Sequence, residues 1–434
     1  MTASKTGTSR NRPHPFPAAL LLLVGLLVAA TPLDRLIAFD VPLLRSLSAA
    51  LGWILVLLYL WTTKGRLTFH HAAQWWALTF VSIVGVLELT RLLAADWIAY
   101  AGTPSIIGAA AMYMSWAQPV VLFLVVSMIA SRRDSVRWVL TGLPIVTATL
   151  AITLVVGGET QRWAPIGLNA NYAGLMFGFG SIIASAQTLS RHRGARGLQL
   201  LNALMIISIP LNLLGVLGSG GRGASAATAV GLVVLLLLSR LRLRQMLALG
   251  FTAFLVLVPL WPLYEEASQI LSDRWERTLE REDYGVRDGL LRVTTELFAE
   301  QPIVGHGIRS TSVIGERWFG ESERPFSAHN TTMTLLVSFG ILGTLPWFVM
   351  LGSAIVHVWR HRRAENATLI LAALTMFMTY MLAGSIMTNR FFYVTLGLAV
   401  CVHYWHSPRV SIAGTSVQPS EELNSTCPRA TTAD

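Results

Sequence analysis

Long apolar runs alternate with short charged or Gly/Pro-rich breaks along almost the whole chain. A helix needs about 20 predominantly apolar residues to cross the hydrocarbon core of a bilayer. The pattern therefore predicts an all-α integral membrane protein with about twelve transmembrane helices. The predicted spans are 17–31, 43–61, 72–90, 106–130, 138–157, 172–189, 198–217, 224–238, 246–263, 331–358, 367–386 and 392–406.

One long polar segment, 264–329, separates the ninth and tenth predicted spans. It predicts two helices, a charged one around Glu265 to Glu282 and an amphipathic one that places Leu290 and Leu297 on one face. Pro302 ends the second helix, and the glycines between Gly305 and Ala328 predict an irregular loop back to the membrane. The segment is therefore the only long excursion that the pattern predicts between spans.

Charge patterning predicts how the spans are oriented. Arginine clusters recur on alternate loops, and cytoplasmic loops carry the excess of positive charge. Both termini are therefore expected in the cytoplasm and segment 264–329 on the outer side of the membrane, with the first span kept as an anchor. The resulting plan is a cytoplasmic N-terminus (1–16), helices 1–9 (17–263), the outer segment (264–329), helices 10–12 (330–406) and a disordered cytoplasmic tail (407–434).

Composition supports a membrane protein and argues against a nucleic-acid partner. Hydrophobic residues make up 53% and charged residues 13% of the chain, whereas about 25% charged residues are usual in soluble domains. The 33 Lys and Arg against 23 Asp and Glu lie in short clusters between apolar runs, so they indicate topology and contact with membrane lipids. The two cysteines support neither a disulfide framework nor a metal site.

A glycine-rich turn, Gly218 to Ser225, precedes the eighth span and contains Arg222 between Gly221 and Gly223. Backbone N–H groups and a cation at a helix start suit a phosphate group. The alternative interpretation is a tight turn whose arginine reaches the lipid headgroups.

Two further residues stand at predicted helix starts on the same side. Arg287 precedes the amphipathic helix, where it could bind an anion or pair with Asp288 or Asp283 at the surface. His329 lies where the segment re-enters the membrane; a helix N-terminus lowers the pKa of a histidine, which suits a general base. The alternative for His329 is an ordinary hydrogen-bonding residue at the membrane interface.

His329 and Asn330 are followed by nine residues and then by Gly340, Ile341, Leu342 and Gly343. This pattern resembles the histidine motif of the O-antigen ligases: His, then Asn, Ser or Gln, nine residues, Gly, two residues, and Gly, Thr or Tyr. Every defined position matches.

Two other segments carry the resemblance. Residues 298–307 resemble the family's segment of a polar pair, Pro, apolar residues and Gly-x-Gly, although His306 replaces the usual small or apolar residue. The turn at Arg222 resembles the family's element of a small residue followed by Arg, with Gly221 where Ser is common. The resemblance extends to the number of spans and the place of the long segment.

The resemblance implies a GT-C-like fold and a glycosyltransferase that transfers O-antigen from undecaprenyl diphosphate to a sugar hydroxyl of lipid A-core. It implies that His329 is the general base and that Arg222 and Arg287 stabilise the diphosphate, with inversion at the anomeric carbon. We expect no cofactor and no metal, because no acidic cluster faces outward. Supporting candidates are Asn330, His306, Arg309, Arg390, Gly221 and Gly223.

Three other functions stay open at this point. An O-antigen polymerase would use the same donor with a second lipid-linked glycan as acceptor, and a protein O-oligosaccharyltransferase would use a protein. A membrane transporter would also fit about twelve spans, but transporters bind near the membrane midplane. Here the chemically suggestive residues lie at one predicted surface.

Overall fold

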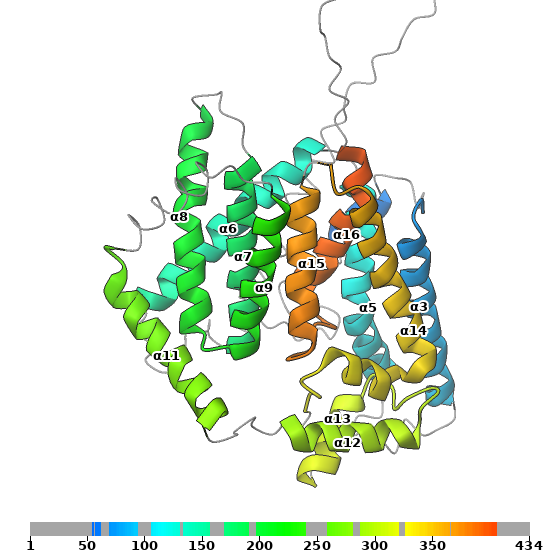
Figure 1. The fold of residues 1–434 in the computed structure, drawn as a ribbon. Coiled ribbons are helices and arrows are strands. Elements are labelled where there is room, and N and C mark those ends of the chain that lie inside the picture. The colour runs from blue at the N-terminus through cyan, green and yellow to red at the C-terminus, as the bar shows by residue number, and fades with distance from the viewer. Residues whose placement is uncertain are drawn as a thin grey trace, which may run out of the picture.

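The computed structural model describes residues 54–55, 57–61, 69–93, 106–130, 133–156, 169–190, 197–239, 258–280, 287–320, 326–364 and 366–405. Every regular element in these residues is a helix (Figure 1). The helices are α3 (Ala72–Leu93), α5 (Ile106–Ile129), α6 (Arg133–Val156), α7 (Ala170–Ser190), α8 (Gly197–Gly218), α9 (Arg222–Leu238), α11 (Trp261–Glu280), α12 (Arg287–Glu300), α13 (Ser310–Phe319), α14 (Thr331–Arg360), α15 (Ala367–Met381), α16 (Arg390–Cys401) and the 3-10 helix η3 (Val402–Trp405).

Three described segments are long and apolar enough to cross a membrane: α3, residues Leu200–Gly218 of α8, and α14. Shorter apolar helices lie at Trp116–Ile129, Leu140–Leu154, Arg222–Leu238 and Ala367–Met381. The prediction of an all-α membrane protein is therefore confirmed in the described residues, whereas the total of about twelve spans stays a prediction.

Nine predicted spans fall in described residues, and each coincides with a helix: α3, α5, α6, α7, α8, α9, α14, α15 and α16. Predicted spans 17–31 and 246–263 and most of 43–61 lie outside the described residues, as do the tail 407–434 and the N-terminus 1–16. In segment 264–329, α11 and α12 are the two predicted helices. The prediction of an irregular loop after Pro302 was wrong in part, because Ser310–Phe319 forms a third helix, α13.

The helices pack as a bundle around an aromatic core. α7 packs against α6, α8 and α9, while α15 packs on α9, α14 on α3 and α16 on α5. Trp347, Phe377 and Tyr393 are completely or almost completely buried where α14, α15 and α16 meet. Large rings bury much apolar surface each, so this junction fixes the C-terminal half of the bundle.

Several histidines lie at the C-terminal end of α14, which is the upper end of this helix in Figure 1. The Nε2 atom of His357 lies 3.1 Å from Nδ1 of His403 in η3. The rings of His71 and His361 lie with their centroids 4.4 Å from that of His357. This end of the bundle is therefore joined across α3, α14 and η3, far along α14 from its first residue.

α14 is broken at Gly340, whose φ of 59° and ψ of −164° interrupt the helix. The loop that follows α12 fills the break. His306 N donates to Val337 O at 2.7 Å and Gly307 N to Ser338 O at 2.6 Å. Two carbonyl groups that a continuous helix would have bonded are thus satisfied by the loop.

The N–H groups on the other side of the break are also satisfied. Ile341 N donates to Pro302 O at 2.8 Å, and Leu342 N donates to Ile303 O at 3.1 Å. Non-helical backbone at membrane depth is tolerated only where protein or water satisfies its polar groups. The segment Pro302–Gly307, which we call the inserted loop, therefore seals the break in α14.

An ion pair clamps the inserted loop to α3. Arg91 Nη1 lies 2.5 Å from Glu88 Oε1, and Arg91 Nη2 donates to the carbonyl groups of Val304 and Gly305 at 2.9 and 2.7 Å. Glu88 Oε1 in turn accepts from Ile308 N at 3.1 Å. The pair thus neutralises itself and satisfies two carbonyl groups of the loop and the N–H group of Ile308, which follows it.

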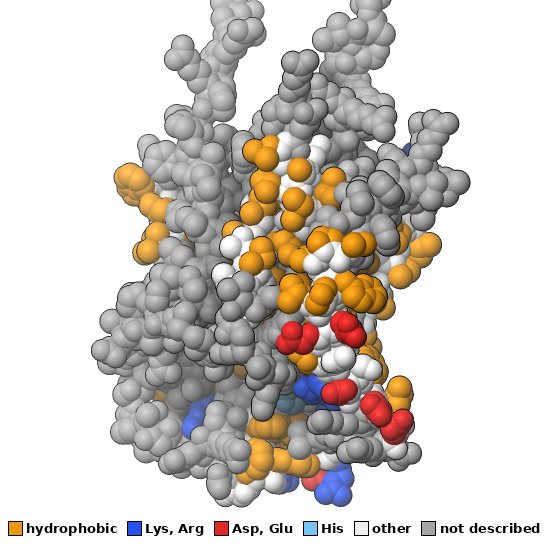
Figure 2. Space-filling model, turned by 90° about the vertical axis from the view of Figure 1, so that its left-hand side faces the viewer, with side chains coloured by type: hydrophobic (Ala, Val, Ile, Leu, Met, Phe, Trp, Pro, Cys, Tyr) orange, Lys and Arg blue, Asp and Glu red, His pale blue; other side chains and the backbone are white. Residues whose placement is uncertain are grey.

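On one face of the bundle, the exposed side chains change from apolar to acidic along the direction of the helices. Figure 2 shows exposed apolar side chains above a group of carboxylates. The apolar side chains include Leu200, Leu204 and Ile207 of α8, whereas α11 exposes carboxylates such as Glu265 and Glu266. An apolar surface bordered by charge is what a protein presents where the hydrocarbon of a membrane meets the headgroups.

Gly340→Ala should destabilise the protein strongly. A Cβ at position 340 would overlap the carbonyl group of Ile303, and the backbone there is one that only glycine adopts readily. We expect a loss of roughly 2–5 kcal/mol, the sum of backbone strain and overpacking. The midpoint temperature of unfolding in detergent should fall accordingly.

Gly352→Ala is the matched control on the same helix. A Cβ at position 352 would meet nothing within 4 Å, so stability should stay constant or rise by up to about 1 kcal/mol. Equal unfolding midpoints for the two variants would contradict the proposed need for glycine at the break.

Candidate active site

His329 lies immediately before α14 in an unusual backbone conformation. Its φ is 50°, in the left-handed region that non-glycine residues seldom adopt. The side chain is partly buried, with its ring edge-on to Phe326 at a centroid distance of 5.5 Å. Such backbone outliers cluster at functional sites, which makes His329 a candidate for a reacting group.

Asn330 is the N-cap of α14, and its Oδ1 accepts a hydrogen bond from Met333 N at 3.1 Å. Asparagine is among the best N-cap residues because its side chain satisfies a free N–H of the first turn. Asn330 therefore starts the helix directly after His329. This contact explains why the motif pairs the two residues.

The environment of His329 favours the neutral imidazole. Burial lowers the pKa of His329 below its ordinary value of 6.5, and the positive charge of Arg287 lowers it further. The sequence predicted the lowered pKa from the helix N-terminus alone, but in the structure burial and Arg287 are the causes. A neutral imidazole at pH 7 can accept a proton.

Arg287 is the first residue of α12, as predicted. Its Nη2 donates to Ala383 O, in the turn after α15, at 3.3 Å. The guanidinium group is also near enough to His329 and Tyr380 to interact electrostatically with both. The structure thus brings Arg287 and His329 together, although 42 residues separate them in the chain.

The turn Ala383–Gly384 joins the candidate residues. Thr331 Oγ1, two residues after His329, donates to Gly384 O at 2.8 Å and accepts from Ile386 N at 3.1 Å. A Cβ on Gly223 would lie 2.6 Å from the Cβ of Ala383. The same turn therefore contacts the start of α14, the start of α9 and the side chain of Arg287.

Arg222 is the first residue of α9, with Gly221 as the N-cap. Its Nη1 donates to Arg274 O of α11 at 3.1 Å. The backbone at Arg222 thus lies beside the turn Ala383–Gly384, whereas its side chain contacts α11.

The glycine-rich turn supplies fewer free N–H groups than the sequence predicted. Gly220 N donates to Leu217 O at 2.9 Å, and Gly221 N donates to Ser219 Oγ at 3.3 Å. The N–H groups available to an anion are therefore those of the first turn of α9, which begins at Arg222.

Three supporting candidates have contacts that hold elements together. His306 Nε2 lies 2.7 Å from Leu297 O, which joins the inserted loop to α12. Arg390 begins α16, and its Nε and Nη2 donate to Gln118 Oε1 of α5 at 3.3 and 3.1 Å. Arg309 is the N-cap residue of α13. These contacts do not involve His329, so a role in chemistry for these residues stays a prediction.

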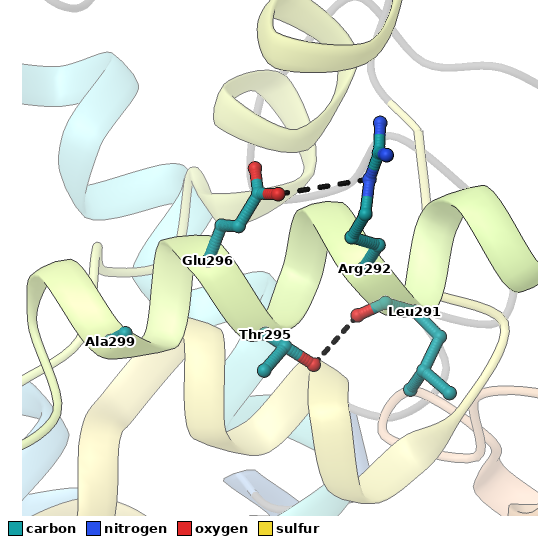
Figure 3. Close-up of a pocket in the computed structure, with 5 residues that line it drawn as sticks. All are labelled: Leu291, Arg292, Thr295, Glu296 and Ala299. Atoms are coloured by element: carbon teal, nitrogen blue, oxygen red, sulfur yellow. Dashed lines mark hydrogen bonds and ion pairs between the residues drawn. The ribbon is translucent and has the colours of Figure 1, made fainter.

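A pocket on the exposed face of α12 lies apart from these residues (Figure 3). Leu291, Arg292, Thr295, Glu296 and Ala299 line it. Arg292 Nε lies 3.7 Å from Glu296 Oε1, and Thr295 Oγ1 donates to Leu291 O at 2.7 Å. Its polar groups thus bind one another, and no predicted site residue lines it.

Among the described residues, no group of three or more His, Cys, Asp or Glu side chains could hold a metal ion. The sequence analysis missed two residues at the site, Tyr380 and Thr331. Tyr380 lies within an apolar run that indicated only a span, and Thr331 follows the motif residues as an ordinary first helical residue. Only their contacts with the turn Ala383–Gly384 connect them with His329.

Removing the charge of Arg287 should raise the pKa of His329 toward 6.5. Burial would still lower the pKa, so we expect a partial shift in Arg287→Gln, whereas Arg287→Lys keeps the positive charge and most of the effect. The pH dependence of diethyl pyrocarbonate modification at His329, read by mass spectrometry, measures this directly. An identical midpoint in Arg287→Gln and the wild type would contradict the electrostatic contact.

The segment that matches a known protein family includes the same region of the chain. Residues 203–348 match the family model described as O-antigen ligase, and no match to an individual curated protein was found. The matched segment contains Arg222, Arg287, His329 and the break at Gly340, so it includes the three predicted site residues. Residues 203–348 of this chain are therefore similar to the O-antigen ligase family.

Proposed function

We propose that this protein transfers O-antigen polysaccharide from undecaprenyl diphosphate to a sugar hydroxyl of lipid A-core. The match of residues 203–348 to the O-antigen ligase family model supports a function within the O-antigen ligase and polymerase superfamily. The transfer reaction that we propose rests on one observation. Arg287 and the starts of α9 and α14 meet at the turn Ala383–Gly384. This arrangement supports a base and a binding site for an anionic leaving group that lie close together.

His329 would serve as the general base. The acceptor hydroxyl oxygen attacks the anomeric carbon of the donor sugar, and its proton passes to a ring nitrogen of His329. The lowered pKa supports this role, because the ring must be neutral before it can accept the proton. The left-handed backbone at His329 supports it too, since strain of this kind persists where the surroundings hold a residue in place.

The bond between the anomeric carbon and the diphosphate oxygen breaks as the new glycosidic bond forms. The electron pair of the broken bond stays on undecaprenyl diphosphate, which leaves with increased negative charge. Arg287 and Arg222 would stabilise that charge, together with the N–H groups at the start of α9. A single displacement of this kind inverts the anomeric configuration and needs no metal.

Arginine at a helix start also supports an anionic ligand. A cation is disfavoured at the positive end of a helix dipole, yet Arg222 and Arg287 are the first residues of α9 and α12. A diphosphate bound between them would offset this repulsion by binding both cations and the N–H groups. Its two phosphate groups suit the fork of a guanidinium group.

The proposed site would face the periplasm of a bacterium, with the donor and acceptor lipids in the outer leaflet of the inner membrane. The boundary of apolar and acidic side chains on α8 and α11 supports a membrane surface near the level of α11 (Figure 2). Both lipid-linked substrates would then reach the site from the side, and the amphipathic helices α11 and α12 would lie over the membrane surface.

An O-antigen polymerase would use the same base and the same leaving group. The two reactions differ only in the acceptor, which is lipid A-core for a ligase and a second lipid-linked glycan for a polymerase. A transfer assay with both acceptors therefore tests the choice.

His329→Ala should lower the rate of transfer to lipid A-core by about 10²–10⁴-fold, the usual contribution of a general base. The assay would use purified protein in detergent, undecaprenyl-diphosphate-linked glycan, lipid A-core and EDTA. His70→Ala, at an exposed histidine before α3, is the control and should keep full activity. Loss of product with EDTA alone would refute a metal-independent reaction, and longer donor chains without transfer to lipid A-core would identify a polymerase.

Arg287→Lys should lower the same rate by at least about tenfold, because lysine keeps the charge but loses the planar fork that binds phosphate oxygens. Arg222→Lys should act in the same direction. Arg292→Lys is the matched control, since its mostly exposed side chain lies on the outer face of α12. A loss in the control as large as that in Arg287→Lys would indicate a general effect on α12.

A further inference from the structure

Tyr380 lies one residue before the end of α15 and is only 6% exposed. Its ring forms part of the turn region described above: a Cβ on Gly384 would lie 2.7 Å from the Tyr380 hydroxyl oxygen. A Cβ on Gly223, in the first turn of α9, would lie 3.8 Å from the ring. The phenol is therefore packed between the start of α9 and the turn Ala383–Gly384.

The hydroxyl group of Tyr380 has no hydrogen-bond partner among the described residues. Other tyrosine hydroxyl groups do have one: that of Tyr113 donates to Val81 O at 2.9 Å, and that of Tyr393 accepts from Trp347 Nε1 at 3.1 Å. A buried hydroxyl without a partner costs free energy, and such groups often mark a ligand position.

The groups around the Tyr380 hydroxyl are suited to an anion. Arg287 is near enough to Tyr380 to interact electrostatically, and its Nη2 binds the carbonyl group of Ala383. The first turn of α9 adds the positive end of a helix dipole from the side of Gly223. A phenol hydroxyl among a cation and helix N–H groups can donate to a negatively charged oxygen.

We propose that the Tyr380 hydroxyl donates a hydrogen bond to a phosphate oxygen of the polyprenyl diphosphate, beside Arg287 and the start of α9. This inference rests on the proposed function and adds a third side-chain donor to the leaving-group site. The donor lies on α15, outside the segment that matches the family model. Transfer would be assisted because the hydrogen bond strengthens as negative charge develops on the departing diphosphate.

Tyr380→Phe tests the proposal because it removes only the hydroxyl group and leaves the ring in place. The probe is undecaprenyl diphosphate, with its binding measured in detergent by displacement of a fluorescent undecaprenyl diphosphate analogue. Hydrogen bonds to charged groups contribute about 1.5–3 kcal/mol, so binding should weaken by about 10–100-fold. The unfolding midpoint without ligand should stay constant, since no described group loses a partner.

Tyr113→Phe is the matched control. Its hydroxyl has a structural bond to Val81 O, so this variant should unfold at a lower temperature and bind undecaprenyl diphosphate as the wild type does. The two variants thus separate a role in packing from a role in ligand binding.

Each other outcome overturns the inference. Unchanged binding in Tyr380→Phe, with a wild type that binds and transfers, rejects the role of Tyr380 and leaves the proposed function standing. A fall in the unfolding midpoint as large as that of Tyr113→Phe assigns the hydroxyl to the fold. A wild type that neither binds undecaprenyl diphosphate nor transfers from it rejects the proposed function and the inference together.

Discussion

The backbone hydrogen bonds across the break in α14 are the constraint on which the rest of the structure depends. At Gly340 the helix leaves four polar groups to be satisfied, and the inserted loop Pro302–Gly307 satisfies all four. Burying unsatisfied N–H and C=O groups is costly in a membrane. The loop must therefore lie against α14, and Glu88 and Arg91 hold it there from α3. This arrangement places α12, and with it Arg287, beside the start of α14.

The candidate site is built where helices begin and end, at one end of the bundle. The turn Ala383–Gly384 binds Arg287 and Thr331 and contacts Gly223, so segments from three parts of the chain meet there. Cations stand at helix starts, where the dipole disfavours them, and the Tyr380 hydroxyl lacks a partner in the described residues. An anion bound between the arginines and the Tyr380 hydroxyl would offset the repulsion at the helix starts and accept a hydrogen bond from the hydroxyl. The site that we propose is therefore arranged around a ligand that carries negative charge.

The motif residues differ in the kind of role that the structure supports. In the pattern that begins at His329, Asn330 caps the helix and Gly340 allows the break, so both act on backbone geometry. His329 itself caps nothing, and its pKa is lowered by burial and by Arg287. The motif thus combines one candidate for chemistry with residues that fix where α14 starts and where it is interrupted. His306 belongs with the second group, because its ring binds α12.

The sequence by itself determined where nine of the described apolar helices lie, and it identified His329, Arg222 and Arg287 as candidates, because apolar periodicity and motif spacing are local properties of a chain. Only the tertiary structure decided that α14 is broken, that α13 forms, and that Tyr380 lies beside Arg287. Those features depend on contacts between segments far apart in the chain, such as the bonds from the inserted loop to α14 on either side of Gly340. No local pattern encodes which distant backbone groups will satisfy each other.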